Sequence, residues 1–313
     1  MLLLGQMAVL FLLMGIGYLC YRKNIITDEV SKKLSAIVVN IANPALVLTG
    51  CLEEEKIQGK ELLTTVIIIV AVYLALLLIA QVLPMLLRVE KRSRGTYRAM
   101  TVFSNIGFMG FPVVAALYGN GAILYAALFT IPYNVLIYTY GISAMSAGDK
   151  REHEKGVDES SGISFLLGRI LNVGVIACII TMIIYFFRIP VPKVAADTIT
   201  HLSNLTAPLS MMVIGASLAT IDLKKLFMDV RLLFFSAIKL LVIPMVGMLL
   251  IRQFVDNEII CGVCLVMLAT PVGSMTAMLA QQYDGDYEMA SKGVALTTIL
   301  SVATIPLVSM LVM

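Results

Sequence analysis

The chain has 313 residues, of which 59% are hydrophobic and only 14% are charged, and its mean hydropathy is +0.94. Soluble domains carry about 25% charged residues, so this composition excludes a soluble globular protein and predicts an all-α polytopic membrane protein. The net charge is +3 and no basic patch is interleaved with aromatic residues, so no nucleic-acid partner is expected.

Ten apolar runs are each long enough to span a bilayer, which takes about 20 residues. A polar segment, 146–162, separates the runs into two groups of five and is interpreted as a solvated cytosolic linker. The first run has no charged residues before it, so we expect a span there and not a cleaved signal. The predicted spans lie near 2–21, 34–52, 62–87, 99–118, 122–145, 163–187, 194–219, 230–251, 258–281 and 289–313.

The basic residues predict which side of the membrane each loop faces. If the N-terminus is outside, 17 of the 23 Lys and Arg residues fall in cytosolic loops and 5 in outer loops, and Lys239 remains inside a span. Cytosolic loops carry such an excess of positive charge. Both termini are therefore predicted on the outer side of the plasma membrane, and the two halves, 1–145 and 163–313, would be inverted relative to each other.

Weak internal symmetry supports an inverted 5+5 repeat. Three groups of residues recur in the same order in the two halves, at offsets of 160–167 residues. They are Asn40 and Pro44 with Asn204 and Pro208, Pro84 with Pro244, and Ser104 and Asn105 with Pro271 and Val272.

The fourth and ninth spans each contain residues that interrupt a helix. The fourth reads TVFSNIGFMGFPVVAALYG from position 101, and the ninth reads LATPVGSMTAMLAQQY from position 268. Proline and glycine inside a helix weaken or break it. A break persists in a membrane only where it is buried in protein or lines a wet cavity. Interrupted spans at matching positions of two halves are typical of a transporter's binding site.

If these two spans cross at their breaks, the N-termini of two half-helices point at one central site and favour a small anion, most simply a carboxylate. Asn105 could cap one half-helix and donate to a ligand. The alternative is that the small residues only permit close helix packing. The candidate substrate-binding residues are Ser104, Asn105, Gly107, Lys239, Pro271, Val272, Gly273, Ser274 and Thr276.

Lys239 is the ionisable residue placed deep in a span, where a charge is costly. It either faces the centre, where it offsets carbonyl dipoles or an anionic substrate, or it snorkels toward the cytosolic surface. No Asp or Glu lies deep in any predicted span, so the coupling ion stays open.

Four further polar or helix-breaking residues are interpreted as either lining the pathway or packing the helices, namely Asn40, Asn43, Pro44 and Asn134. With two histidines, and neither HExxH nor GxSxG, the sequence predicts no metal centre, no cofactor and no enzyme activity. The CxxC pair Cys261 and Cys264 is interpreted as two small thiols on one helix face.

These motifs resemble those of the auxin efflux carrier family, whose bacterial members include malate and malonate permease-like proteins. The segment SNIGFMGFP at 104–112 is similar to the family's Pro-Asn-x-x-x-Met-Gly-x-Pro, with Ser104 in place of the first proline. Pro271-x-Gly273, followed by Ala280-x-x-Tyr283, resembles the family's second crossing segment. Lys239 stands five residues before Pro244, as a basic residue does in the family.

The resemblance implies an inverted-repeat transporter that works as an elevator. Spans 1, 2, 6 and 7 would form a scaffold that makes a homodimer, and spans 3–5 and 8–10 would form the moving transport domain. The substrate carboxylate would bind near Asn105 and Pro271–Val272. The favoured function is secondary transport of a small mono- or dicarboxylate such as malate or malonate. A membrane protein that senses a ligand without transporting it is the alternative, and a channel ranks lower because no span shows a full polar stripe.

Overall fold

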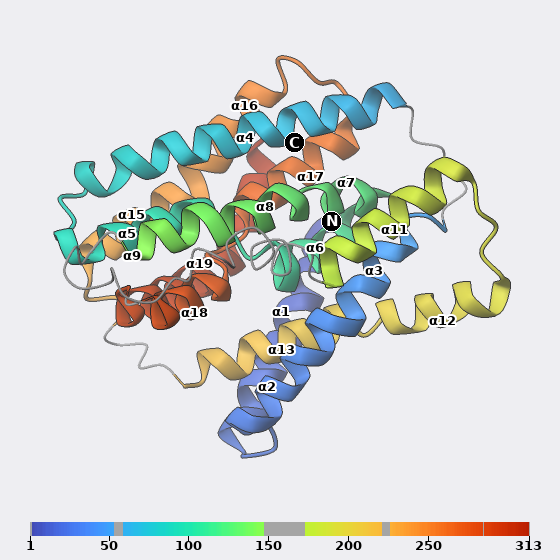
Figure 1. The fold of residues 1–313 in the computed structure, drawn as a ribbon. Helices are drawn as coiled ribbons and strands as arrows, with labels where there is room; N and C mark the ends of the chain where they lie inside the picture. Colours follow the sequence, from blue (N-terminus) through green and yellow to red (C-terminus); the bar gives the residue numbers. More distant parts are fainter. Residues whose placement is uncertain (1, 53–58, 147–172, 221–225, 284, 313) are drawn as a thin grey trace, which may run out of the picture.

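The computed structural model describes residues 2–52, 59–146, 173–220, 226–283 and 285–312. Within these ranges the elements are helices, and the single β-type contact is an isolated antiparallel bridge between Ser104 and Val272 (Figure 1). The predicted linker 146–162, apart from its first residue, and the start of the predicted sixth span lie outside the described residues.

The first half forms helices where the sequence predicts its first five spans. The helices in order are α1 (Leu2–Arg22), α2 (Asp28–Ile37), the π-turn η1 (Val38–Ala42), α3 (Asn43–Thr49), α4 (Gly59–Leu86), α5 (Lys91–Val102), the π-turn η2 (Ile106–Gly110), α6 (Phe111–Tyr118), the 3-10 turn η3 (Asn120–Ala122), α7 (Ile123–Leu128), α8 (Thr130–Leu136), the π-turn η4 (Ile137–Gly141) and α9 (Ile142–Ser146).

The described residues of the second half are also helical. Its helices are α11 (Val173–Phe187), α12 (Lys193–Ser203), α13 (Thr206–Leu218), α15 (Val230–Ala237), the π-turn η6 (Ile238–Val242), α16 (Ile243–Ile251), α17 (Glu258–Ala269), α18 (Ser274–Gln282) and α19 (Tyr287–Val312).

Two helices, α2 and α5, begin more than one turn before the predicted spans. The α2 helix begins at Asp28, because the Thr27 side chain caps it by accepting a hydrogen bond from the Val30 amide at 3.4 Å. The α5 helix begins at Lys91, so Arg94 and Arg98 belong to a helix and not to a loop. Lys and Arg are good helix formers whose long side chains can reach a polar surface, so a basic run does not end a helix.

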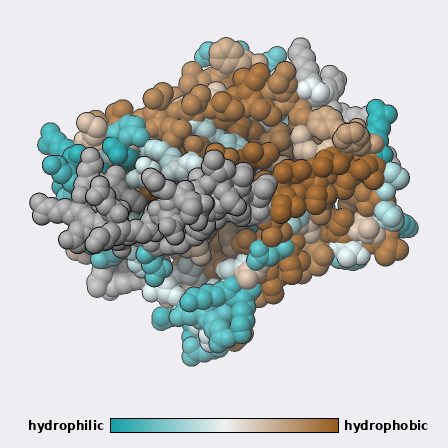
Figure 2. Space-filling view, viewed as in Figure 1, coloured by the Kyte–Doolittle hydropathy of each residue, from teal (hydrophilic) through white to brown (hydrophobic). Residues whose placement is uncertain are grey.

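Hydropathy and length together mark four described stretches as long and apolar enough to cross a membrane: 61–86, 120–145, 230–251 and 287–312. The segments 106–118, 173–187 and 258–269 are apolar but shorter. Figure 2 shows hydrophobic residues spread over the upper and right parts of the visible face, whereas hydrophilic residues gather at the lower tip and the left edge. This distribution fits a polytopic membrane protein.

Three π-turns lie directly before a proline that is inside a helix. The turns η1, η2 and η6 each end two residues before Pro44, Pro112 and Pro244. In an α-helix the proline ring clashes with the carbonyl four residues earlier and leaves it without an N–H partner. In all three cases that carbonyl lies within the π-turn, where the backbone is wound more loosely. The helix therefore continues directly into α3, α6 and α16 at these prolines.

Two close contacts join α1 to α13. Gly17 of α1 lies against the backbone of Met212 in α13, and Gly215 of α13 lies against the backbone of Met14. Small residues of this kind let membrane helices approach closely. The α17 helix is buried along residues 260–269 and packs among α6, α7, α16 and α19. The break at its end is therefore held deep in the core.

Candidate functional site

The two helix breaks meet and pair through their main chains. The chain leaves α5 after Val102 and leaves α17 after Ala269. The Asn105 amide donates a hydrogen bond to the Pro271 carbonyl at 2.7 Å, and the Gly273 amide donates to the Phe103 carbonyl at 2.9 Å. A broken helix leaves main-chain groups without partners inside the protein. The antiparallel pairing satisfies four of these groups at once.

Local sequence explains where each break falls. The Asn105 Oδ1 atom accepts a hydrogen bond from the Phe108 amide at 3.3 Å, so Asn105 caps the half-helix formed by η2 and α6. Thr270 is extended, as the residue before a proline prefers to be, and its hydroxyl donates to the Met267 carbonyl at 2.9 Å. Pro271 then prevents α17 from continuing.

The paired segments, residues 103–105 and 271–273, are called the crossing below. Lys239 lies beside the crossing and is fully buried, with 0% of its surface exposed. Its Nζ donates to the Thr101 carbonyl at 2.9 Å and to the Ser104 Oγ at 2.8 Å. The side chain thus faces the protein centre and does not snorkel to the surface. A cation is favourable at the C-terminal end of a helix, and Lys239 occupies that position for α5.

Thr297 of α19 is a crossing residue that the sequence analysis did not identify. Its Oγ1 accepts a hydrogen bond from the Val272 amide at 3.1 Å and donates to the Gly293 carbonyl at 2.7 Å. A threonine that bonds its own helix is common, so its type and position carry no signal of this second role. Only the packing of α19 against the break reveals it.

The start of α18 is closely packed against the first break. A side chain at Gly273 would place its Cβ 3.0 Å from the Ser104 carbonyl oxygen, so glycine permits the pairing. Ser274 is half-buried. Thr276 is fully buried, and its hydroxyl has no hydrogen-bond partner in the described part of the chain.

Four residues were predicted either to line the transport pathway or to pack the helices. One of them, Asn43, makes a hydrogen bond to the segment that follows the crossing. The Asn43 Nδ2 donates to the Gly107 carbonyl at 3.1 Å. Pro44 is buried next to it. Asn40 is exposed and donates to Ala36 of its own helix, while Asn134 donates to Thr130 of its own helix.

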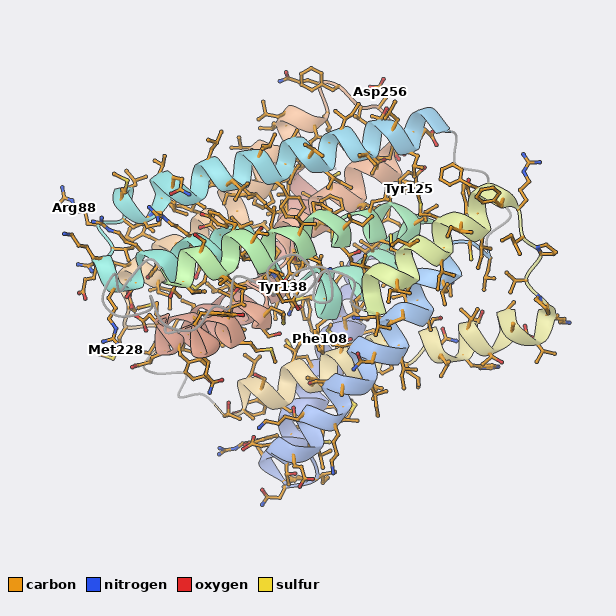
Figure 3. The ribbon with its side chains drawn as sticks, in the orientation of Figure 1. Arg88, Phe108, Tyr125, Tyr138, Met228 and Asp256 are labelled. Carbon is orange, nitrogen blue, oxygen red and sulfur yellow. The ribbon has the colours of Figure 1, made fainter. Side chains whose placement is uncertain are left out.

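The crossing itself has little free space. Ser104 and Ile106 line a cavity of about 10 Å³ together with Tyr73, Phe129 and Met267, which is enough for about one water molecule. Figure 3 shows Phe108 of η2 between one end of the molecule, marked by Arg88 and Met228, and the other, marked by Tyr125 and Asp256. In this view η2 therefore lies between these two ends.

A larger cavity of about 610 Å³ opens at the end marked by Met228. It is lined by polar and charged side chains at the starts of α5, α15 and α19, namely Glu90, Ser93, Tyr97, Asp229, Arg231 and Asp286. Asp229 and Asp286 accept hydrogen bonds from the amides of Leu232 and Met289 and so cap α15 and α19. In the described residues, no three His, Cys, Asp or Glu side chains are grouped to hold a metal ion.

The comparisons with known proteins agree with this architecture. A family model described as membrane transport protein matches residues 2–309. An uncharacterized transporter of Methanothermobacter thermautotrophicus is 24% identical over 298 residues, covering 93% of this chain and 92% of that protein. An uncharacterized transporter of Methanocaldococcus jannaschii is 24% identical over 311 residues, covering 96% and 95%. The chain therefore belongs to the membrane transport protein family, the auxin efflux carrier family that its motifs resemble.

Proposed function

We propose that this protein is a secondary transporter of a small organic anion, a mono- or dicarboxylate such as malate or malonate, and that the crossing of the two breaks forms its binding site. The observation that carries the proposal is the main-chain pairing of Asn105 with Pro271 and of Gly273 with Phe103. The half-helix of η2 and α6 begins directly after Asn105, and α18 begins directly after Gly273. Two helix N-termini, each with partial positive charge, thus start at one point.

The substrate carboxylate would bind to the amide groups at these N-termini, with the Asn105 side chain beside them. Ser274 and Thr276 lie in the first turn of α18 and would add hydroxyl donors. Lys239 is already bonded to Thr101 and Ser104. Its part is therefore to hold the break and to add positive potential behind the site, and direct contact with the substrate is not needed for this.

An elevator mechanism within a ten-span inverted repeat accounts for the way the crossing is held. Lys239 from the eighth predicted span and Thr297 from the tenth bond the paired breaks of spans four and nine. These bonds would make spans 3–5 and 8–10 one rigid transport domain. The scaffold of spans 1, 2, 6 and 7 would supply Asn43 as the side chain that the domain meets at Gly107. A homodimer in the plasma membrane, with both termini outside, completes the proposal.

The experiment that tests transport is counterflow in proteoliposomes. Vesicles are loaded with one unlabelled small carboxylate at a time, and the uptake of labelled malate or malonate is followed. Counterflow requires no ion gradient, so it does not depend on the coupling ion. We expect accelerated uptake with at least one acid. If folded protein accelerated uptake with none of the acids, a carboxylate carrier would be rejected. The alternative, a ligand sensor that does not transport, would then be favoured.

The Asn105→Ala variant tests the site itself. It removes the cap of η2 and the amide that would face the substrate, so we expect counterflow to fall by about tenfold or more, the effect of one lost cap together with one lost ligand bond. Asn40→Ala is the matched control, because Asn40 is exposed and bonds only its own helix among the described residues. If Asn105→Ala exchanged every substrate as fast as wild type, the crossing would be rejected as the binding site.

A further inference from the structure

One polar residue interrupts the apolar outer face of α4. This helix lies along the upper edge of the molecule in Figure 1, and its exposed residues between Leu63 and Leu86 are apolar except for Gln81. In a protein that spans a membrane such a face meets lipid, where a polar side chain is unfavourable. Gln81 therefore requires polar partners at its position.

Gln81 lies where the headgroup region of a bilayer meets its hydrocarbon core. The α4 helix has 28 residues, so it is about 42 Å long, close to the full thickness of a bilayer with its headgroups. Gln81 is five residues before the end of α4 near Arg88 (Figure 3), which is about 8 Å along the helix. The headgroup region is about 5–8 Å thick on each side, so a lipid headgroup is within reach of this position.

The α5 helix packs against the segment formed by η4 and α9. Gly95 of α5 lies against the backbone of Ala144 in α9, and a Cβ atom at Gly141 would be 3.1 Å from the Phe103 ring. As the residue number rises from 95 to 103 along the first segment, it falls from 144 to 141 along the second. The two segments therefore run antiparallel.

This contact places Arg98 beside Tyr140. Arg98 is three residues after Gly95 and Tyr140 is four residues before Ala144, so each lies about one turn further along the face that makes the contact. The charge of Arg98 acts on the Tyr140 hydroxyl. The Gln81 Nε2 in turn donates a hydrogen bond to the Tyr140 Oη at 3.1 Å. Three different segments, α4, α5 and η4, thus bring these side chains together.

The three side chains offer hydrogen-bond donors that the described part of the chain does not use. The Arg98 Nε is buried and has no partner among the described residues. Tyr140 accepts from Gln81, which leaves its own hydroxyl hydrogen and the second N–H of Gln81 for a further acceptor. Buried donors are nearly always paired, because an unpaired one is destabilising. The missing partner is therefore an acceptor from outside the chain.

The charges around the cluster favour an anion. The α5, η4 and α9 segments contain no acidic residue, and the acidic residue of α4, Glu61, lies at its other end. The first turn of α5 adds the basic residues Lys91, Arg92 and Arg94. Basic pockets between membrane helices on the cytosolic side bind anionic headgroups. A headgroup amine would find no carboxylate here.

We propose that Arg98, Gln81 and Tyr140 bind the phosphate of an anionic phospholipid, whose acyl chains lie along the exposed face of α4 beside Leu78 and Val82. In the predicted topology this lipid belongs to the cytosolic leaflet. The inference does not depend on which anion the crossing binds.

Quenching of tryptophan fluorescence by brominated lipids tests this site, because the chain has no tryptophan of its own. Leu78→Trp places an indole about one turn from Gln81, and Ile67→Trp places one three turns further along the same face. The native residues are 71% and 60% exposed. Each protein is reconstituted in phosphatidylcholine with a rising fraction of brominated phosphatidylglycerol. We expect phosphatidylglycerol to be preferred by about fivefold or more beside residue 78, and by less than about twofold beside residue 67.

Variants in the Leu78→Trp protein assign the preference to the cluster. Arg98→Met should reduce it to about twofold or less, and Gln81→Leu, at an exposed position, should lower it by about half. Arg92→Met is the matched control, because it removes the same charge from an exposed position of α5. Arg92 is about 9 Å from Arg98 along the helix, beyond the screening length of about 8 Å at physiological salt. Its preference should stay near that of the parent protein.

Equal preference beside residues 78 and 67 would overturn the proposal, and so would a preference that both Arg98→Met and Gln81→Leu leave intact. Inorganic phosphate is added as a competitor to separate a lipid headgroup from the free ion. If phosphate abolished the preference, the cluster would be a site for the free ion, and the lipid would be rejected. Quenching is measured without substrate, so its result is independent of the counterflow assay.

Discussion

We expect the Lys239→Met variant to lose roughly a hundredfold of its carboxylate counterflow, because two buried acceptors lose their donor and each unpaired group costs about 1–3 kcal/mol. The acceptors are the Thr101 carbonyl and the Ser104 hydroxyl, at the exact point where α5 gives way to the crossing. Without the ammonium group the break relaxes, and the amides that would bind the carboxylate lose their alignment.

Folding stability should respond less than transport does in this variant. Removing a buried charge also removes the unfavourable free energy of taking that charge out of water, and an apolar replacement of similar size is often neutral. Lys292→Met is the matched control, because Lys292 lies near the start of α19 and pairs with Glu288 at the surface. A Lys239→Met protein that melts like wild type and exchanges like wild type would show that the crossing does not need its cation.

The second large effect is expected at the contact of α1 with α13. Gly17→Ala would drive a methyl group into the backbone of Met212, so we expect a loss of roughly 1–3 kcal/mol in the free energy of unfolding, as for other overpacked sites. Gly15→Ala, two residues away on the same helix, meets nothing within 4 Å. It should be neutral or slightly stabilising, since alanine favours helix by about 1 kcal/mol over glycine.

Thermal unfolding can be followed through the protein's own cysteines. The chain has no tryptophan, whereas Cys178, Cys261 and Cys264 are free and buried. A dye that becomes fluorescent on reaction with thiols therefore reports unfolding. Equal melting temperatures for Gly17→Ala and Gly15→Ala would mean that α1 and α13 separate easily, and that their contact does not stabilise the protein.

The sequence allowed the positions of the helix breaks and of Lys239 to be predicted because these features are local. Asn105, Pro271 and Gly273 act on their own turns, and a lysine inside an apolar run is visible without any fold. The hydrogen-bond partners around these residues could not be predicted in this way. The bond from Asn43 to Gly107 joins residues that are far apart along the chain. The bond from Val272 goes to Thr297, whose hydroxyl also bonds its own helix. They follow from helix packing, which hydrophobic patterning does not specify.

The start of α5 was also beyond prediction from composition. A hydropathy profile ends a span where charge begins, but the helix continues through Arg94 and Arg98 to Lys91. Helix formation depends on backbone propensity, and arginine and lysine have a high propensity. The predicted start of the fourth span and the start of α5 therefore differ by about two helical turns.

The pairing of the two breaks makes no use of the main-chain amide at position 104. The bonds across the crossing use the Asn105 amide and the Phe103 carbonyl, so the amide of Ser104 takes no part in them. A proline, which has no amide hydrogen, can stand there in related motifs without weakening the pairing. With serine at this position, the hydroxyl gives Lys239 a second acceptor. A replacement at position 104 would therefore change the potential around Lys239 while both main-chain bonds of the crossing stay in place.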